Sequence, residues 1–173
     1  MNVDRTTDRL CALPPVLDAC CATRAFWYDR ADGRALFIDK RREVHVIDKG
    51  TPGTKGRSPI VVAPDMVADF TDMPFPDESF HLVVFDPPHV QRKQALGAVT
   101  QRYGHLTGDW RAMLKAGFAE CFRVLKGNGV LVFKWGESQF KVAEILALAP
   151  ARPLFGHKTS KTTHWAVFIK EAA

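Results

Sequence analysis

The sequence predicts an α/β fold that is doubly wound around a mostly parallel β-sheet. Apolar runs of strand length recur along the chain, and each is bounded by turn residues. Between two of them, from Trp110 to Leu125, apolar residues return at the spacing of an α-helix. Continuous apolar strands that alternate with helices are typical of parallel sheets, because the crossover helices cover both faces of the sheet.

Each expected element has a local signal in the sequence. The helix over 110–125 has Asp109 as its N-cap, and Gly127 to Gly129 is expected to end it. A second helix is expected near 139–148, and the long polar segment 90–108 is expected to be a functional loop. Strands are expected at the apolar runs 16–18, 35–38, 60–63, 82–85, 130–133 and 165–169.

Length and composition indicate one soluble domain that spans residues 1–173. The chain has 46% hydrophobic and 25% charged residues, which is the mixture of a globular protein. No apolar run approaches the roughly 18 residues that cross a bilayer, and residues 1–8 form no hydrophobic signal core. We therefore expect a cytoplasmic protein with no membrane contact.

The cysteines do not have the spacing of a metal site. The adjacent pair at 20–21 lacks a second pair at zinc-site spacing, so we expect reduced, buried thiols beside a ligand and no metal. Phe26 and Trp27, which follow closely, are expected in the core, and the alternative is that they pack on the ligand. The four cysteines are Cys11, Cys20, Cys21 and Cys121.

Acidic residues stand at or shortly after the ends of four predicted strands. Asp18, Asp39 and Asp86 close the first, second and fourth apolar runs, and Asp69 follows the third. Ligands of open parallel sheets bind outside the carboxyl ends of the strands, where a carboxylate can accept hydrogen bonds from ribose hydroxyls. Asp39, about twenty residues beyond the first strand, has the spacing of such a contact. The alternative is that these aspartates only cap turns or helices.

The most specific motif is Asp86-Pro87-Pro88-His89, directly after a predicted buried strand. The prolines fix the backbone, so the Asp86 carboxylate and the Pro87 carbonyl are held at the edge of the sheet. An amine on an aromatic ring is a poor nucleophile, and acceptors aimed at its hydrogens can localise its lone pair. His89 offers a flat ring for stacking. We predict that these four residues are catalytic; the alternative is a rigid turn without a catalytic role.

The order of elements and the motif at 85–89 resemble class I methyltransferases that depend on S-adenosyl-L-methionine (SAM). The similarity is to the amino-methylating branch, whose motif reads Asp/Asn-Pro-Pro-Tyr/Phe. Short phage and prophage proteins, usually described as SAM-dependent or DNA methyltransferases, resemble the chain over nearly its whole length. The resemblance implies a Rossmann-like fold with a seven-stranded sheet and SAM as cofactor. The segments that carry this similarity are 17–21, 26–28, 69–71, 117–125 and 163–165.

The resemblance also implies which residues contact the cofactor. The chain departs from the pattern in the turn at 19–23, which lacks the usual glycines and their access to positive backbone angles. His89 also replaces the more familiar aromatic residue of the motif. Cofactor contacts are implied at Asp18, Ala19, Cys20, Cys21, Asp39, Asp69 and Phe70.

Two basic segments are expected to hold the acceptor. The net charge of +5 favours a polyanionic partner, and basic residues mixed with aromatic ones suit phosphate contact and base stacking. The alternatives are a solvated loop for the first segment and a polar hairpin turn for the second. Substrate contacts are expected at Arg92, Lys93, Arg102 and Tyr103 in the first segment, and at Lys158 and Lys161 in the second.

These features predict methyl transfer from SAM to an exocyclic amine, with adenine in DNA as the favoured acceptor. The alternatives are the same chemistry on RNA, a protein glutamine or a small molecule, and an idle SAM-fold binding module, since the first turn lacks glycine. A chain of 173 residues has no room for a separate target-recognition domain. Sequence selectivity is therefore expected from the basic segments, from a partner or from a homodimer.

Overall fold

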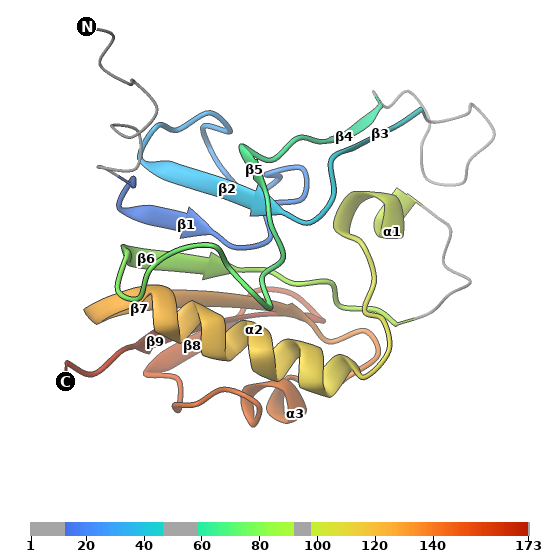
Figure 1. Cartoon of the computed structure of the whole chain (residues 1–173). Helices are drawn as coiled ribbons and strands as arrows, with labels where there is room; N and C mark the ends of the chain where they lie inside the picture. The colour runs from blue at the N-terminus through green and yellow to red at the C-terminus, as the bar shows by residue number, and fades with distance from the viewer. Residues whose placement is uncertain (1–12, 47–58, 92–97, 173) are drawn as a thin grey trace, which may run out of the picture.

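The structure, a computed structural model, describes residues 13–46, 59–91 and 98–172 (Figure 1). Its main sheet has the strand order β5-β2-β1-β6-β7-β9-β8 in the described residues. Neighbours from β5 to β7 pair in parallel, and β9 is antiparallel to both β7 and β8. This confirms the predicted α/β fold with a mostly parallel seven-stranded sheet. The strands are β1 Val16–Asp18, β2 Ala35–Asp39, β5 Met66–Val67, β6 Phe80–Phe85, β7 Leu125–Gly136, β8 Phe155–Lys158 and β9 Thr163–Ile169.

The apolar run at 60–63 lies outside the main sheet. Its strand, β4 Ile60–Val62, pairs antiparallel with β3 Glu43–His45 in a separate two-stranded ribbon. The third strand of the main sheet is instead β5, so the prediction that 60–63 belongs to the parallel sheet is wrong. The reason is that Val61 faces solvent, which suits a half-buried ribbon. The two exposed residues of β5 carry too short a pattern to be recognised in the sequence.

The helices agree with the predictions in part. The main helix is α2 Trp110–Val124, and the Asp109 side chain caps it by accepting from the amides of Arg111 and Ala112. Gly127 to Gly129 does not end it, because Leu125 is already extended and begins β7. The second helix is shorter than expected, and the predicted loop contains a helical turn. These are α3 Val142–Leu146 and α1 Ala98–Tyr103, and no described helix is long and apolar enough to span a bilayer.

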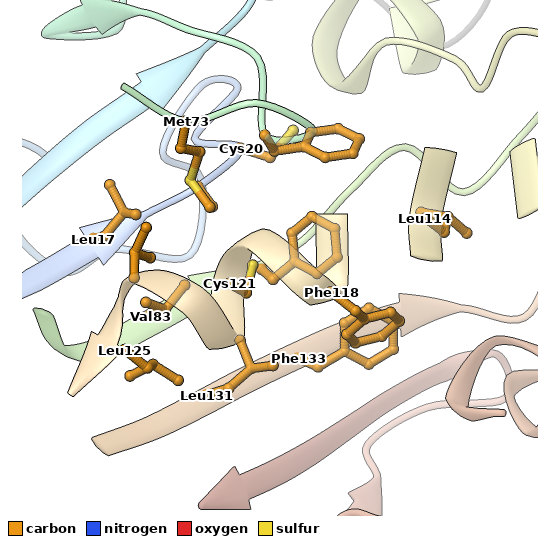
Figure 2. Packing of buried hydrophobic residues seen from close by; sticks show 14 of the residues in the cluster. Leu17, Cys20, Met73, Val83, Leu114, Phe118, Cys121, Leu125, Leu131 and Phe133 are labelled. Atoms are coloured by element: carbon orange, nitrogen blue, oxygen red, sulfur yellow. The ribbon is translucent and has the colours of Figure 1, made fainter. Parts of the chain in front are cut away.

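The main core lies between α2 and one face of the sheet (Figure 2). Phe118 of α2 packs on Phe85 of β6 and Phe133 of β7, with ring centroids 5.4 and 4.9 Å apart. Gly117 allows this approach, because a Cβ there would lie 2.7 Å from Phe70 and 2.8 Å from Phe85. Each such buried side chain contributes roughly 1.5–3 kcal/mol, so α2 is fixed against the strands that carry the motif.

A loop, rather than a helix, connects β1 to β2 and covers the other face of the sheet. Residues 19–34 contain no helix, and Trp27 from this loop packs on Phe37 of β2 with ring centroids 4.8 Å apart. Phe37 and Cys21 belong to a smaller buried cluster, separate from the main core. Trp27 is therefore only partly buried and packs against this smaller cluster, where it fixes the loop above the carboxyl end of β1.

Candidate active site

Three buried aspartates meet at the carboxyl edge of the sheet. Asp39 ends β2, Asp18 ends β1 and Asp86 follows β6, and these three strands are neighbours in the sheet. The exposed fractions of Asp18, Asp39 and Asp86 are 0%, 2% and 8%, and the described residues bury no other charged side chain to this extent. Buried carboxylates are costly unless partners compensate them, so this group of three is the candidate functional site.

Asp18 is held by two donors. Its Oδ2 accepts from the indole of Trp27 at 2.7 Å, and its Oδ1 accepts from the amide of Cys20 at 3.2 Å. Burial raises the pKa of Asp18 to about 7, although these two hydrogen bonds lower it and the charges of Asp86 and Asp39 raise it further. A nearby positive charge would stabilise the ionised form of this carboxyl group.

The first turn forms without glycine and is buried. Ala22 adopts a left-handed backbone angle, with φ of 47°, and its amide donates to Asp39 Oδ2 at 3.0 Å. Ala19 is fixed in the same turn by donating its amide to the carbonyl of Val84 at 2.9 Å. The turn thus crosses from β6 to β2 over the end of β1, as a cofactor-binding turn must.

The thiols of the first turn are not poised as nucleophiles. Burial raises the pKa of Cys20 well above its usual value and that of Cys21 to about 12, and the neighbouring aspartates raise both further. Within residues 13–46, 59–91 and 98–172, no three His, Cys, Asp or Glu side chains are grouped so as to hold a metal ion. The thiols are therefore packing groups.

Arg41 links Asp39 to the segment around α1. Its Nε lies 3.2 Å from Asp39 Oδ1, and its backbone amide donates to the same oxygen at 2.9 Å. Its guanidinium also donates to the carbonyls of Gln101 and Arg102 at 3.1 and 3.3 Å. The carboxylate expected to bind ribose is therefore shared with an arginine that holds α1 over the sheet edge.

A narrow pocket lies between the sheet edge and this segment. Its volume is about 80 Å³. Cys20, Asp39, Phe70 and Pro88 line it on the sheet side, and 103–107 lines it on the other. Sequence positions far apart are thus brought together, including the implied cofactor contacts at the ends of β1 and β2.

Asp69 lies outside the lining of this pocket. Its Oδ1 accepts from the amide and the hydroxyl of Thr71 at 3.0 and 2.9 Å, which caps the turn after β5. Phe70, its neighbour, is 3% exposed and packs on Phe85 with ring centroids 5.2 Å apart. The cofactor contact at Asp69 stays a prediction, and the structure shows a turn cap there.

The motif after β6 forms a compact group with Lys134 of β7. Pro87 and Pro88 are buried, and Oδ2 of Asp86 lies 2.6 Å from the ammonium group of Lys134. The other oxygen, Oδ1, faces Nε2 of His89 at 3.0 Å, but without the angle of a hydrogen bond. Among the described residues these are the two buried side-chain atoms that lack a hydrogen-bond partner. Such atoms require an explanation, and a functional role is one.

His89 is fixed by its neighbours on β7. Its ring packs on Trp135 with centroids 4.8 Å apart and planes at 63°. Gly136 leaves room for the imidazole, because a Cβ at this position would lie 2.6 Å from His89 Nδ1. The side chain of His89 is 22% exposed, so part of the ring is accessible.

The second basic segment lies at the same edge of the sheet as the motif. β8 runs parallel to β7, since both are antiparallel to β9, so the turn after β8 lies beside the end of β7. Glu137 joins the two: its amide donates to the Thr162 carbonyl at 2.7 Å, and its carboxylate lies 3.2 Å from His164. The hydrogen bond from the Val142 amide lowers the pKa of Glu137, and the hydrogen bond with His164 lowers it further by a smaller amount. Lys158 and Lys161 are exposed on this turn.

The first basic segment divides into two parts. Arg92 and Lys93 lie outside the described residues. Arg102 and Tyr103 are the end of α1, where Tyr103 lines the narrow pocket and the Arg102 carbonyl accepts from Arg41. Tyr103 therefore lies across the narrow pocket from Asp39, while substrate contact by Arg102, Tyr103 and the two lysines of the hairpin stays a prediction.

Sequence reasoning missed three polar contacts of the site. Lys134 lies on the face of β7 away from α2, Arg41 follows β2, and Trp27, expected only to pack, donates its indole N–H to Asp18. Lys134 carried a weak signal, because a lysine interrupts the apolar run near the carboxyl end of a predicted strand. The other two contacts depend on how the loops fold back, which no periodicity in the sequence records.

The fold matches solved structures at low sequence identity. A crystal structure of a protein from Pyrococcus horikoshii OT3 covers 98% of this chain and 93% of its own, with a TM-score of 0.57 and 14% identity. A SAM-dependent methyltransferase from Methanosarcina mazei covers 99% of this chain and 100% of its own, with a TM-score of 0.55 and 13% identity. The chain has the methyltransferase fold.

A SAM-dependent methyltransferase from Leishmania major shows the same methyltransferase fold over 93% of this chain and 69% of its own, with a TM-score of 0.50 and 12% identity. No protein-family model matches the sequence, and the search of curated proteins finds no match. In the methyltransferase fold of this chain the strand order reverses between β1 and β6, where ligands of doubly wound sheets bind. Asp18 and Asp86 stand on the two sides of this point.

Proposed function

We propose that the protein is a SAM-dependent methyltransferase that methylates an exocyclic amine, with adenine in DNA as the favoured acceptor. The observation that carries the proposal is an oxygen of Asp86 that makes no hydrogen bond. Oδ1 is buried at the point where the strand order reverses and faces only the His89 ring, at 3.0 Å from Nε2, while Lys134 holds Oδ2. An acceptor in this position suits the hydrogens of an amine that must be activated for attack.

The residues present fit SAM by their chemistry. Asp39 is buried at the end of β2, where it can accept from ribose hydroxyls. Asp18, whose pKa burial raises to about 7, gains a counter-charge from a cationic ligand. Phe70 and Cys20 provide apolar walls for an adenine ring. When bound, SAM supplies a methyl group on a sulfonium, which is already an activated leaving group.

The volume of the pocket requires movement before such a ligand enters. Sites for ligands of this size usually have about 300–1,000 Å³, and the narrow pocket has about 80 Å³. The segment 103–107 and the Arg41 side chain form its outer wall. We infer that Arg41 shifts from Asp39, or shares it with the ribose, and that α1 moves outward with it.

In the proposed reaction the protein positions the acceptor amine. Asp86 Oδ1 and the Pro87 carbonyl accept from its two hydrogens, which localises the nitrogen lone pair on the side that faces the methyl group. Lys134 fixes the carboxylate through Oδ2, so that Oδ1 keeps one direction. Asp86 Oδ1 then receives the proton that the nitrogen loses when the new N–C bond forms.

Charge at the sheet edge supports a nucleic-acid acceptor. The chain has a net charge of +5, and Lys158 and Lys161 are exposed on the hairpin turn beside the end of β7. Phosphates close to the acceptor base would meet these lysines and Arg102. RNA, a protein glutamine and a small molecule are the competing acceptors for the same chemistry.

An idle binding module is a second candidate, and two observations favour it. Ala22 occupies a left-handed conformation that glycine adopts without cost, and Arg41 already pairs with the carboxylate expected to bind ribose. Both features weaken cofactor binding relative to an open turn. A protein with this fold that binds nucleic acid without methyl transfer would show them equally.

The deciding experiment is transfer of a labelled methyl group from SAM to separate pools of unmethylated DNA, RNA and protein. We expect label in DNA, on adenine N6, and none with Asp86→Ala. SAM binding by this variant, measured by calorimetry, is expected to stay near that of the wild type, because Asp86 acts on the acceptor side. Label in another pool identifies another acceptor, and no SAM binding by the wild type at millimolar cofactor, with no transfer to any pool, favours the idle module.

A further inference from the structure

A larger pocket lies beside the motif and adjoins the narrow one, with which it shares His105 and Thr107. Its volume is about 470 Å³. Gln91 lines it from the segment after β6, residues 105–108 from the approach to α2, and Gln139 and Phe140 from the turn after β7. The Leu106 amide donates to the Val90 carbonyl at 2.8 Å, so the segment before α2 is tied to the motif segment. The pocket therefore has walls from three parts of the chain.

The two glutamine amides of this pocket are oriented by their neighbours. The backbone amide of Gln91 donates to Gln139 Oε1 at 2.7 Å. The Gln91 side chain donates through Nε2 to the Gly108 carbonyl at 3.2 Å. A backbone N–H requires an oxygen and a carbonyl requires an N–H, so neither side chain can be flipped without losing its bond. Within the described residues, Gln91 Oε1 and Gln139 Nε2 make no hydrogen bond, so the glutamines that line the pocket offer it an acceptor and a donor.

The apolar part of the pocket is aromatic and supported from behind. The Phe140 ring lies against Trp110 of α2, with centroids 4.1 Å apart and planes at 31°. Leu106 beside it is buried. Phe140 is also fixed through its backbone, because its carbonyl accepts from the indole of Trp135 at 3.1 Å. The pocket thus contains the rigid Phe140 ring together with a hydrogen-bond donor and a hydrogen-bond acceptor whose orientations are fixed.

We propose that this pocket binds an unpaired nucleobase adjacent to the base whose amine lies at Asp86. This assignment rests on the proposed function, because the bound base belongs to the nucleotide next to the acceptor base. A nucleobase is planar, stacks on an aromatic ring, and carries a hydrogen-bond donor next to an acceptor on its Watson–Crick edge. This edge is available only when the base is unpaired, so the acceptor strand is single-stranded or opened at this point.

The position of the pocket favours the neighbouring base over the target base. Neither Asp86 nor His89 lines it. Gln91 is two residues beyond His89 in the chain, a span of at most about 7 Å. A base bound between Gln91 and Gln139 is therefore close to the motif without occupying it, as the next nucleotide of a bound strand must be. The pocket then contributes to the choice of the target site.

The test compares strands that differ only in their bases. Mixed-sequence single strands of about twelve nucleotides, and abasic strands of the same length and charge, are titrated against the wild type by fluorescence anisotropy. We expect the base-containing strand to bind about tenfold more tightly, since stacking and two hydrogen bonds are gained. Gln91→Leu and Gln139→Leu should reduce this ratio to about twofold or less and leave affinity for the abasic strand unchanged.

Two further variants separate recognition from folding. Gln139→Glu keeps the shape of the side chain but replaces the donor by an acceptor, and we expect the same loss of ratio with unchanged thermal unfolding. Gln101→Leu removes a glutamine side chain that does not line the pocket, and the tenfold ratio should survive. Equal affinity for both strands in the wild type, an unchanged ratio in the pocket variants, or tighter binding of a glutamine-rich peptide overturns the proposal.

Methyl transfer to the same strands is measured in parallel. If the wild type transfers methyl groups and the pocket variants keep the wild-type binding ratio, the pocket does not bind a base. The proposed function is then retained. If the binding ratio depends on both glutamines but no acceptor is methylated, the proposed function is rejected. Base binding by the pocket is then retained. The two failures are therefore distinct.

Discussion

The ammonium group of Lys134 lies 2.6 Å from Oδ2 of Asp86, which places a cation of β7 against the carboxylate that follows β6. The side chains are 19% and 5% exposed, so solvent screens this pair weakly. Lys134 also lies 5.5 Å from the ring centroid of Phe26 and 5.8 Å from that of Trp165. Two rings and one carboxylate thus hold the lysine, and the lysine fixes the direction of the free oxygen.

This relationship predicts energetic coupling between the two side chains. Lys134→Met leaves a buried carboxylate without a counter-charge and is expected to lower the free energy of unfolding by about 3 kcal/mol. Adding Asp86→Asn should offset part of this loss, giving a coupling of at least about 1 kcal/mol in a double-mutant cycle by urea unfolding. Lys115→Met, on the exposed face of α2, is the control. Effects that add within about 0.5 kcal/mol would contradict the pairing.

Asp18 predicts a pH dependence of stability. Its pKa in the folded protein is about 7 against an ordinary 3.8, so the folded state keeps a proton that the unfolded state releases. The contribution of Asp18 to stability therefore falls as pH rises from about 4 to 7 and stays low above that. Asp18→Asn should be close to the wild type at pH 4 and more stable at pH 8, by on the order of 2–4 kcal/mol.

Urea unfolding at both pH values measures this difference, because groups common to both proteins cancel. The amide resembles the protonated carboxyl group, since each keeps an oxygen that can accept from Trp27. Asp72→Asn, the same substitution at an exposed position, is the control for replacing a carboxylate by an amide. A difference in stability between Asp18→Asn and the wild type that stays constant with pH would show that burial does not raise the pKa of Asp18.

The same carboxyl group predicts how cofactor affinity changes with pH. A cationic ligand binds best when Asp18 is ionised, so SAM affinity should rise as pH increases through about 7. For a single group with this pKa, the ionised fraction grows about tenfold between pH 6 and pH 8. Calorimetry should show an increase approaching this factor in the wild type and a flatter dependence in Asp18→Asn. Equal slopes for the two proteins would place the positive charge of the ligand elsewhere.

The strand ends of the site could be predicted from the sequence because they follow apolar runs. The runs that end at Asp18, Asp39 and Asp86 are buried on both faces, so each gives a continuous signal, and parallel strands bring their ends to one edge. The same logic failed at 60–63, where an apolar run forms a ribbon instead. It failed again at β5, whose two residues are exposed.

The contacts that complete the site could not be predicted in this way. Arg41 reaches the Gln101 carbonyl of α1 across 60 positions of sequence, and Lys134 reaches Asp86 across 48. Such pairs depend on the register between neighbouring strands and on loop conformation, neither of which a linear pattern encodes. The positive backbone angle of Ala22 was also hidden, because the residue type argues against it.

Ala22 predicts a stabilising substitution. A left-handed conformation costs a non-glycine residue about 1–2 kcal/mol, while glycine adds about 0.4–1 kcal/mol of unfolded-state entropy. Ala22→Gly should therefore raise the free energy of unfolding by about 0.5–1 kcal/mol, provided that the amide keeps its bond to Asp39. Ala19→Gly, at a buried position of the same turn without a positive φ, should instead destabilise the protein. Urea unfolding of both variants checks the sign.

Gly136 predicts a loss of function through His89. A Cβ at this position would lie 2.6 Å from His89 Nδ1, so Gly136→Ala must push the imidazole away from Trp135 and change its approach to Asp86 Oδ1. A displacement of about 1 Å at a reacting centre can cost about a hundredfold in rate. We therefore expect at least a tenfold lower rate of methyl transfer, with SAM affinity unchanged because the implied cofactor contacts lie at and after the ends of β1, β2 and β5.

The matched control is Gly33→Ala, since a Cβ there meets nothing within 4 Å. This variant should transfer methyl groups at the rate of the wild type. Rates are compared at saturating SAM, and unfolding by urea confirms that both variants are folded under the assay conditions. A normal rate for Gly136→Ala would mean that the reaction does not depend on where the His89 ring stands. A parallel loss of SAM affinity would mean instead that the carboxyl end of β7 supports the cofactor as well as the acceptor.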